Sequence, residues 1–286
     1  MMEQGGKEKS DNISQILDHI QKLPSLPSLV IEILENFDNE KLDVATLAHK
    51  IACDQAIVAR VMRVANSPFF GLSGQIGSIP EAISVLGFNN LRGLVMAASI
   101  INAFPQSGKD FDWTTFWQHS IATAVCAKVL ARHSGLNPET AFTAGLLHDI
   151  GKLVMGVYFP QAFIQVNEYN DCSTYEALRA EQAAIGMDHA ELGGEIAKRW
   201  CFPTEIREAI ELHHVPDLQQ GETLADVVYI ANLFSHALDD GHIREEKAAL
   251  LASETWARLG LGADKLDALA AEAQCLYEGA VTLVGG

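Results

Sequence analysis

Apolar residues recur at the spacing of a helix along almost the whole chain, and this pattern restricts the possible folds more than any other feature of the sequence. Alternating apolar and polar runs, which are typical of strands, are absent or very short. The pattern therefore predicts an all-α fold. In the first part of the chain it predicts helices over 12–22, 27–37, 43–52, 55–66, 80–86 and 88–103. The breaks between them contain Pro24, Pro27, Pro68, Gly71, Gly74 and Pro80, residues that favour turns.

A polar stretch at 105–110 separates these helices from a second set. Helices are predicted there over 112–134, 138–155, 160–170, 173–184, 189–200, 203–214 and 221–238, with two more between 246 and 282. We expect a disordered tail over residues 1–10, an N-terminal helical lobe over 11–109, and a second helical lobe with a C-terminal extension over 110–286.

Composition excludes several functional classes. The 286 residues include 20 Lys and Arg against 37 Asp and Glu, a formal charge of −17, and no basic run is visible. Such a chain would be repelled by nucleic-acid phosphates, so we expect no nucleic-acid partner. No stretch approaches the roughly 20 apolar residues that a membrane helix needs, and the polar N-terminus does not resemble a secretory signal. We therefore expect a cytoplasmic protein without membrane contact.

Two polar residues interrupt the most apolar of the predicted helices, 138–155. His148 and Asp149 lie in its middle with apolar neighbours on nearly every side, so both should be buried. A buried carboxylate costs several kcal/mol unless a cation compensates it, typically about 3–5 kcal/mol when a partner is missing. Lys152 could provide that charge in a metal-free core. Histidine beside aspartate also suits a divalent metal, and the residues leave both possibilities open.

More histidines occur in comparable settings: His119 in the 112–134 helix, His189 at the start of another, and the pair His213–His214 at the end of a third. The remaining histidines, His19, His49, His133, His236 and His242, have polar neighbours or lie at helix ends. We expect these to be surface residues without a role in the site.

Several motifs in order resemble a known family. The series His119, His148–Asp149, His189, His213–His214 resembles the metal ligands of the HD superfamily of phosphohydrolases, particularly the branch related to HD-GYP cyclic-dinucleotide phosphodiesterases. The segments Leu23-Pro-Ser-Leu-Pro-Ser28, Asp54 to Pro68 and Ser78 to Gly87, together with Trp200-Cys-Phe-Pro203, are similar to the HDOD domain, a bacterial signalling relative. The resemblance covers roughly residues 20 to 238 and implies an HD-type helical bundle with the N-terminal lobe of HDOD proteins.

The resemblance also implies a metal centre. Asp149 would bridge two divalent ions, with His119 and His148 in a first site and His189, His213 and His214 completing a second site. Lys152 would help to hold a phosphate. Two cations sharing a carboxylate can activate water and bind a phosphate oxygen. One or two ions of Fe, Mn, Zn or Ni fit this donor set, and the sequence does not choose among them.

The sequence departs from the enzymatic pattern at three positions. Asn232 stands where the family has a final aspartate, so the first site should bind metal less tightly. Asp226 lies six residues earlier, on another face of the helix, and should not replace it. Thr115 stands where some relatives have an acidic ligand for a third ion. After His214 the chain lacks the Gly-Tyr-Pro signature.

These features favour an intracellular signal-transduction module that binds metal, with weak or no catalysis. Its expected partners are signalling proteins and a phosphate-containing small molecule, and its oligomeric state is open. The alternative is an active metal-dependent phosphohydrolase acting on a cyclic dinucleotide or a nucleotide phosphate, with Lys152 and Asp149 in the reaction. A third possibility is a metal-free interaction scaffold with a self-paired polar cluster.

Overall fold

The computed structural model is built from helices, and its described residues contain no strand. The structure describes residues 16, 18, 20–23, 25–35, 44–66, 76–87, 91–93, 95–96, 99, 111–167, 174–215, 223–240 and 253–281. The all-α prediction is therefore confirmed. The predicted tail over 1–10 and the predicted lobe boundary at 109–110 lie outside the described residues.

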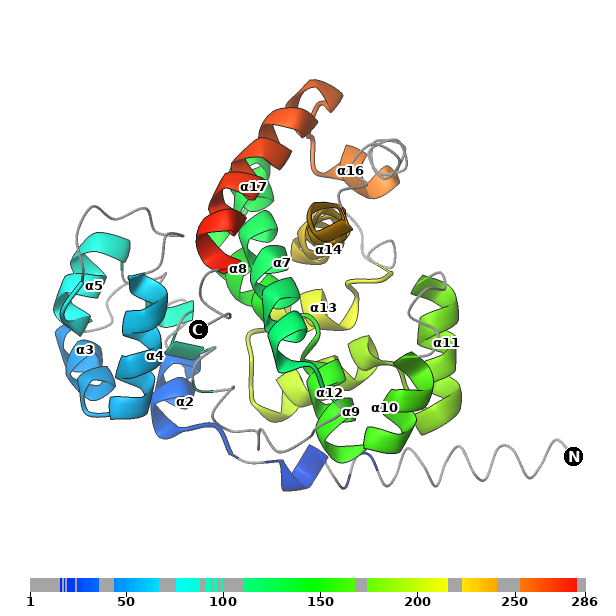
Figure 1. The fold of residues 1–286 in the computed structure, drawn as a ribbon, viewed down its shortest axis with the longest axis horizontal. Helices are drawn as coiled ribbons and strands as arrows, with labels where there is room; N and C mark the ends of the chain where they lie inside the picture. The colour runs from blue at the N-terminus through cyan, green and yellow to red at the C-terminus, as the bar shows by residue number, and fades with distance from the viewer. Residues whose placement is uncertain are drawn as a thin grey trace, which may run out of the picture.

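The N-terminal helices gather on one side of the molecule, at the left of Figure 1. They are α2 (Ser28–Glu35), α3 (Val44–Ala52), α4 (Gln55–Ala65) and α5 (Ile79–Leu86). Ser78 caps α5 by accepting a hydrogen bond from the Glu81 backbone N–H, and Pro80 occupies the first turn. Both residues explain why the helix starts there.

The remaining helices lie toward the centre and right of Figure 1, where the long helix α7 (Trp113–Ser134) crosses the middle of the view. They are α8 (Pro138–Leu147), α9 (Ile150–Tyr158), α10 (Pro160–Asn167), α11 (Thr174–Ile185), α12 (His189–Arg199), α13 (Thr204–Glu211), α14 (Leu224–Asp240), α16 (Glu254–Arg258) and α17 (Leu266–Val281), with a short 3₁₀ turn at Ala263–Lys265. Helices α8, α14 and α17 pack directly against α7. No helix among the described residues combines the length and the apolarity required to cross a bilayer.

Local signals set the limits of α7 and α8. The Asp112 carboxylate accepts hydrogen bonds from the backbone N–H groups of Thr114 and Thr115, and α7 ends at Gly135 in the left-handed conformation, with φ 81°. Asn137 then caps α8, whose first residue is Pro138. These are ordinary start and stop signals, so the connection from α7 to α8 is encoded locally.

The prediction of a single helix over 138–155 is wrong. The structure ends α8 at Leu147 and begins α9 at Ile150, with His148 and Asp149 in the turn between them. Asp149 leaves the helical conformation (φ −95°, ψ 16°), and its side chain does not cap α9. Apolar periodicity continues through the break because both helices are buried, so the pattern could not reveal it.

One hydrophobic core extends from the N-terminal helices to α17. It includes Trp117 and Trp200, both buried, and Trp113 packs against it. These tryptophans therefore anchor the core. Polar residues buried within this core are therefore costly unless they are partnered, and His148, Asp149, His189 and His213 are among them.

Candidate metal centre

Five histidines and one aspartate meet at the centre of the helical bundle. His119 lies on α7, His148 and Asp149 in the turn between α8 and α9, His189 at the first residue of α12, and His213 and His214 just after α13. Their donor atoms form two groups: the Asp149 group (His119, His148 and Asp149) and the three-histidine group (His189, His213 and His214). Within each group the donor atoms lie within 4.8 Å of one another.

Glycines let the helices approach closely enough to form these groups. A Cβ atom on Gly151 of α9 would overlap the His189 carbonyl oxygen and lie 3.0 Å from the Gly193 backbone nitrogen on α12. A Cβ on Gly145 of α8 would lie 2.9 Å from the Ala124 Cα on α7. The backbones are thus nearly in contact at both crossings, which brings the His148–Asp149 turn against His189 and His119.

The Asp149 carboxylate lies between the two groups. Its Oδ2 is 3.4 Å from His148 Nε2 and 3.6 Å from His119 Nε2. Its Oδ1 is 3.2 Å from His189 Nε2 and 3.6 Å from His213 Nε2. One oxygen therefore faces each group, which is the arrangement that a bridging carboxylate requires.

Hydrogen bonds on the far side of the rings define the tautomers. His148 Nδ1 lies 2.7 Å from the Gly145 carbonyl oxygen, and His213 Nδ1 lies 2.7 Å from the Ile210 carbonyl oxygen. His189 Nδ1 lies 2.7 Å from Glu181 Oε2. Carbonyl and carboxylate oxygens only accept, so Nδ1 carries the proton in each ring. In the neutral rings, Nε2 then presents a lone pair to the cluster.

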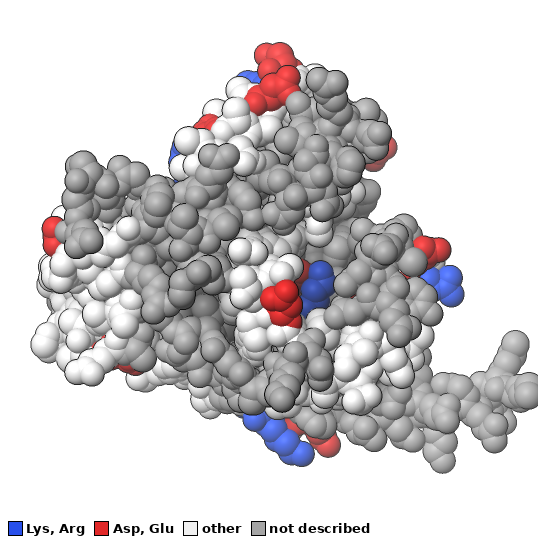
Figure 2. Space-filling view, viewed as in Figure 1, with Lys and Arg blue, Asp and Glu red and all other residues white. Residues whose placement is uncertain are grey.

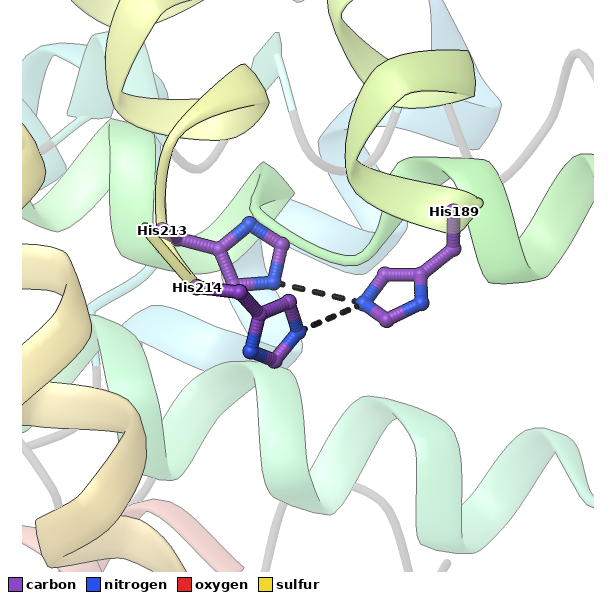
Figure 3. Close-up of side chains that lie close together, drawn as sticks. All are labelled: His189, His213 and His214. Carbon is purple, nitrogen blue, oxygen red and sulfur yellow. Dashed lines mark hydrogen bonds between the residues drawn. The ribbon is translucent and has the colours of Figure 1, made fainter. Parts of the chain in front are cut away.

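The Nε2 atoms of neighbouring histidines lie so close together that their lone pairs would repel one another. His189 Nε2 lies 2.9 Å from His214 Nε2 and 3.3 Å from His213 Nε2, and Figure 3 shows the two rings of the pair pointing at His189. In the Asp149 group, His119 Nε2 lies 3.2 Å from His148 Nε2. Facing acceptors need a cation between them, either a proton or a metal ion. Imidazole nitrogens with one carboxylate oxygen are a donor set that divalent transition metals prefer, so the residues fit such an ion.

Burial keeps most of these histidines neutral. It lowers the pKa of His148 to about 3, with the Asp149 charge opposing it. Burial is also the main cause of the lowered pKa values of His119, His213 and His214. Neutral imidazole is the form that binds metal, so these rings need not lose a proton first.

His189 and Asp149 behave differently. Burial and the Lys152 charge lower the pKa of His189, but the Glu181 charge and hydrogen bonds to Asp149 and Glu181 outweigh them and raise it to about 9. Burial raises the pKa of Asp149, yet His148, Lys152 and the contacts from His189 and His213 hold it well below its usual range. Without a metal, a proton on His189 therefore partly neutralises the cluster.

Lys152 provides a second cation. Its Nζ donates a hydrogen bond to Asp149 Oδ2 at 2.8 Å, and its side chain is one-third exposed (33%). The ion pair considered from the sequence is therefore present. Lys152 contacts only Asp149 Oδ2, the oxygen that faces the Asp149 group. Oδ1 still faces His189 and His213 of the three-histidine group.

The residues at which the sequence departs from the enzymatic pattern lie as follows. Asn232 is buried on α14, and its Oδ1 accepts no hydrogen bond from any residue that the structure describes. Asp226 is buried elsewhere, in an ion pair with Arg258, which confirms that it does not replace Asn232. Thr115 is exposed and donates its hydroxyl to Asp112. Residues 216–222, which follow His214 where relatives have the Gly-Tyr-Pro signature, lie outside the described part of the chain.

The structure adds Glu181 and Ser235, which the sequence did not single out, and it brings His236, which was expected to lie apart from the site, close to His119. Glu181 on α11 binds the His189 ring. Ser235 lies 3.4 Å from His119 Nδ1 and donates its hydroxyl to the Asn232 carbonyl oxygen. His236 is exposed, as expected, but its ring centroid lies 4.7 Å from that of His119. For Ser235 and His236 the spacing from Asn232, three and four residues along one helix, was an available signal. For Glu181 no such signal existed.

Comparison with known proteins shows the family of the chain. The HDOD domain matches residues 23–216. The chain belongs to the HDOD family. Two solved structures are similar over nearly their whole length. One is an HDOD domain protein with unknown function from Geobacter sulfurreducens, 25% identical, with a TM-score of 0.77 and coverage of 95% of this chain and 98% of that one. The other is a candidate phosphohydrolase from Shewanella amazonensis, 26% identical, with a TM-score of 0.78 and coverage of 94% and 98%.

The HDOD assignment confirms the predicted family and helical architecture. An uncharacterized protein of Treponema pallidum is also similar, with 26% identity over 230 residues that make up 79% of this chain and 44% of that protein. This HDOD chain spans less than half the length of the curated relatives that it matches first.

Proposed function

We propose that this HDOD protein is a signal-transduction module whose HD-type site binds one or two divalent transition metals and serves ligand binding or protein interaction, with weak or no catalysis. The observation that supports metal binding is the convergence of Nε2 lone pairs around Asp149 while the opposite ring nitrogens are held by fixed acceptors. Such outer partners orient metal-binding histidines in many proteins. The signalling role rests on the family resemblance, and its partners would be signalling proteins.

The two groups should differ in affinity. The three-histidine group has three imidazoles and Asp149 Oδ1, a complete set for one four-coordinate ion. The Asp149 group has two imidazoles and Asp149 Oδ2, for which Lys152 competes at 2.8 Å. Its remaining candidate ligand, Asn232, brings no charge. We therefore expect the first equivalent of metal at the three-histidine group.

A bound divalent metal would supply a Lewis acid able to polarise a phosphate oxygen. The chain's own contribution is Lys152, whose partly exposed ammonium lies beside the cluster and can contact an anionic group that enters it. A phosphate-containing small molecule is therefore the ligand class that the site fits. Figure 2 shows Lys and Arg only at separate positions on the face in view, among the residues that it colours, without a broad basic surface.

A metal-dependent phosphohydrolase is the second candidate. Lys152 beside Asp149 favours it, as does the similarity to the candidate phosphohydrolase from Shewanella amazonensis. Against it stands Asn232, because a neutral amide in place of a carboxylate leaves the Asp149 group short of negative charge for a second ion. Binding without efficient turnover fits these residues better.

Elemental analysis tests the proposal. The protein is purified without chelator or added metal, beside the double variant His213→Ala/His214→Ala. We expect about one equivalent of transition metal in the parent, in line with the four-ligand set of the three-histidine group, and its loss in the variant. His133→Ala, which removes a histidine remote from the cluster, is the matched control and should retain the metal. A metal-free parent would refute the proposal and support a scaffold with a self-paired cluster.

A further inference from the structure

Glu181 is a buried carboxylate that is not one of the candidate metal ligands. It lies on α11, and its side chain is 5% exposed. Its Oε2 accepts two hydrogen bonds from the same residue, one from the His189 backbone N–H and one from His189 Nδ1, both at 2.7 Å. Burying a carboxylate is expensive, so these two bonds are its main compensation.

The two hydrogen bonds hold both the backbone N–H and the imidazole ring of His189. The backbone bond satisfies an N–H group in the first turn of α12, which has no partner within the helix. The ring bond directs Nδ1 toward α11 and thereby turns Nε2 toward His213, His214 and Asp149. The ring can neither flip nor change tautomer without breaking a short hydrogen bond to a charged acceptor.

His189 differs in this respect from the other buried histidines. His148 and His213 are oriented by carbonyl oxygens three residues earlier, within their own helical turns. His189 begins its helix and has no preceding turn to supply such a carbonyl. Its orientation therefore depends on a residue from another helix.

We propose that Glu181 is the positioning residue of the three-histidine group: it sets the tautomer and direction of His189 so that the group can bind a divalent metal. This inference rests on the proposed function, since it concerns the same metal. Glu181 itself does not contact the ion. Comparable outer carboxylates change metal affinity by about 10–100-fold when removed.

Two conservative substitutions separate position from charge. Glu181→Gln retains the length of the side chain and an oxygen acceptor but removes the charge. Glu181→Asp retains the charge but withdraws the carboxylate by one methylene, beyond the reach of Nδ1. A positioning role predicts that Glu181→Asp weakens metal binding more than Glu181→Gln, whereas a purely electrostatic role predicts the reverse order.

The helix start provides the matched control. Glu191 accepts a hydrogen bond from the Asp188 backbone N–H in the capping box of α12, whereas the described partner of His189 Nδ1 is Glu181. Glu191→Ala therefore disturbs the same helix terminus without changing the imidazole. If Glu181 acted only as a helix cap, Glu191→Ala would weaken the metal site to a similar degree.

The experiment is a titration of the chelator-stripped 286-residue chain with Co²⁺, followed by the visible absorption of the bound ion, with circular dichroism to check folding. We expect Glu181→Asp to weaken Co²⁺ binding by about 10–100-fold, Glu181→Gln by less, and Glu191→Ala by less than about 3-fold. In addition, ¹⁵N spectra of histidine-labelled, metal-free Glu181→Gln protein should retain the Nδ1–H tautomer of His189.

Each outcome has a distinct meaning. No Co²⁺ binding by the parent refutes the proposed function and this inference with it. If the parent binds Co²⁺, three results would overturn the role of Glu181 alone. They are equal Co²⁺ affinity in the two Glu181 variants, a greater loss of affinity in Glu181→Gln than in Glu181→Asp, and a loss in Glu191→Ala equal to that in Glu181→Asp. A Glu181→Asp protein that fails to fold leaves the Glu181→Gln spectrum as the deciding measurement, and an Nε2–H tautomer there refutes the inference.

Discussion

Asn232 is the residue at which the sequence departs most clearly from the enzymatic pattern. Its side-chain oxygen is buried and accepts no hydrogen bond within the described part of the chain, although buried polar atoms normally have a partner. Ser235, three residues later on α14, contacts His119, so this turn of α14 lies beside the Asp149 group. The amide oxygen is therefore available as a neutral ligand.

Asn232→Asp should strengthen the Asp149 group. An added carboxylate raises the local negative charge, so we expect a second equivalent of metal to bind at least about 10-fold more tightly than in the parent. The metal-free variant should lose about 3 kcal/mol of stability because a buried charge lacks a partner. Metal titration measures the first effect, and Asn232→Ala serves as the control without an oxygen ligand.

The same variant separates the two candidate functions. If the phosphohydrolase alternative is correct, hydrolysis of a simple phosphodiester should rise in Asn232→Asp together with the second equivalent of metal. Unchanged activity with two ions bound would count against that alternative and leave ligand binding as the function of the site.

At the scale of elements, the site depends on how closely α9 and α12 approach. Gly151 and Gly193 face each other across this crossing, and Gly193 also lies against Ile210 of α13. The turn that carries Asp149 is thereby pressed against the first residue of α12. Predicting this crossing requires the distance between two helices, which helical periodicity does not contain.

Gly151→Ala should disrupt this crossing. The new methyl group would overlap the His189 carbonyl oxygen, which is backbone and cannot move aside cheaply. We expect a loss of about 3 kcal/mol in the free energy of unfolding, together with weaker metal binding, because α12 must shift. Denaturant unfolding and metal titration measure the two effects.

Gly77→Ala is the matched control, since a Cβ there would meet only a flexible Glu81 oxygen at 3.5 Å. Its stability should change by less than about 1 kcal/mol. If Gly151→Ala were as stable as this control and bound metal normally, the close approach would not be what forms the site.

At the scale of the whole molecule, metal binding should be coupled to stability and pH through His189. The raised pKa of about 9 means that protonated His189 stabilises the metal-free fold fully below pH 6.5, its unfolded value, and that this stabilisation is lost as pH rises through 9. The pKa values of the other four histidines are lowered in the folded protein, so protonation of these rings destabilises the fold only below about pH 6.5. They are His119, His148, His213 and His214. The window between pH 6.5 and 9 therefore reports on His189.

We expect the melting temperature of the metal-free protein to fall across this window, relative to a His189→Gln variant. A metal ion displaces the proton from His189, so the apparent affinity should rise about 10-fold per pH unit below pH 9. The increase in melting temperature on adding Zn²⁺ should therefore grow with pH, reaching about 5 °C when the free ion exceeds its dissociation constant about 100-fold. Thermal unfolding at pH 6.5, 7.5 and 8.5 measures this. A metal effect that is independent of pH would contradict the raised pKa.

Much of this protein follows from the sequence alone. The helical period, the capping residues Asp112 and Asn137 and the proline at position 138 act within a few residues of one another, and they determined the all-α fold and most helix limits. The order of His119, His148–Asp149, His189 and His213–His214 named the candidate ligands through its resemblance to HD proteins, because each motif is local.

Only the tertiary structure decided how these residues act together. The break of the predicted 138–155 helix, the placement of one Asp149 oxygen at each group, and the contact of Glu181 with His189 all depend on how helices cross. Helix crossings arise from close packing between distant segments, and the backbone contact at Gly151 sets the one that matters most here. Local patterns name the candidate ligands, but only packing turns their lone pairs toward a common point.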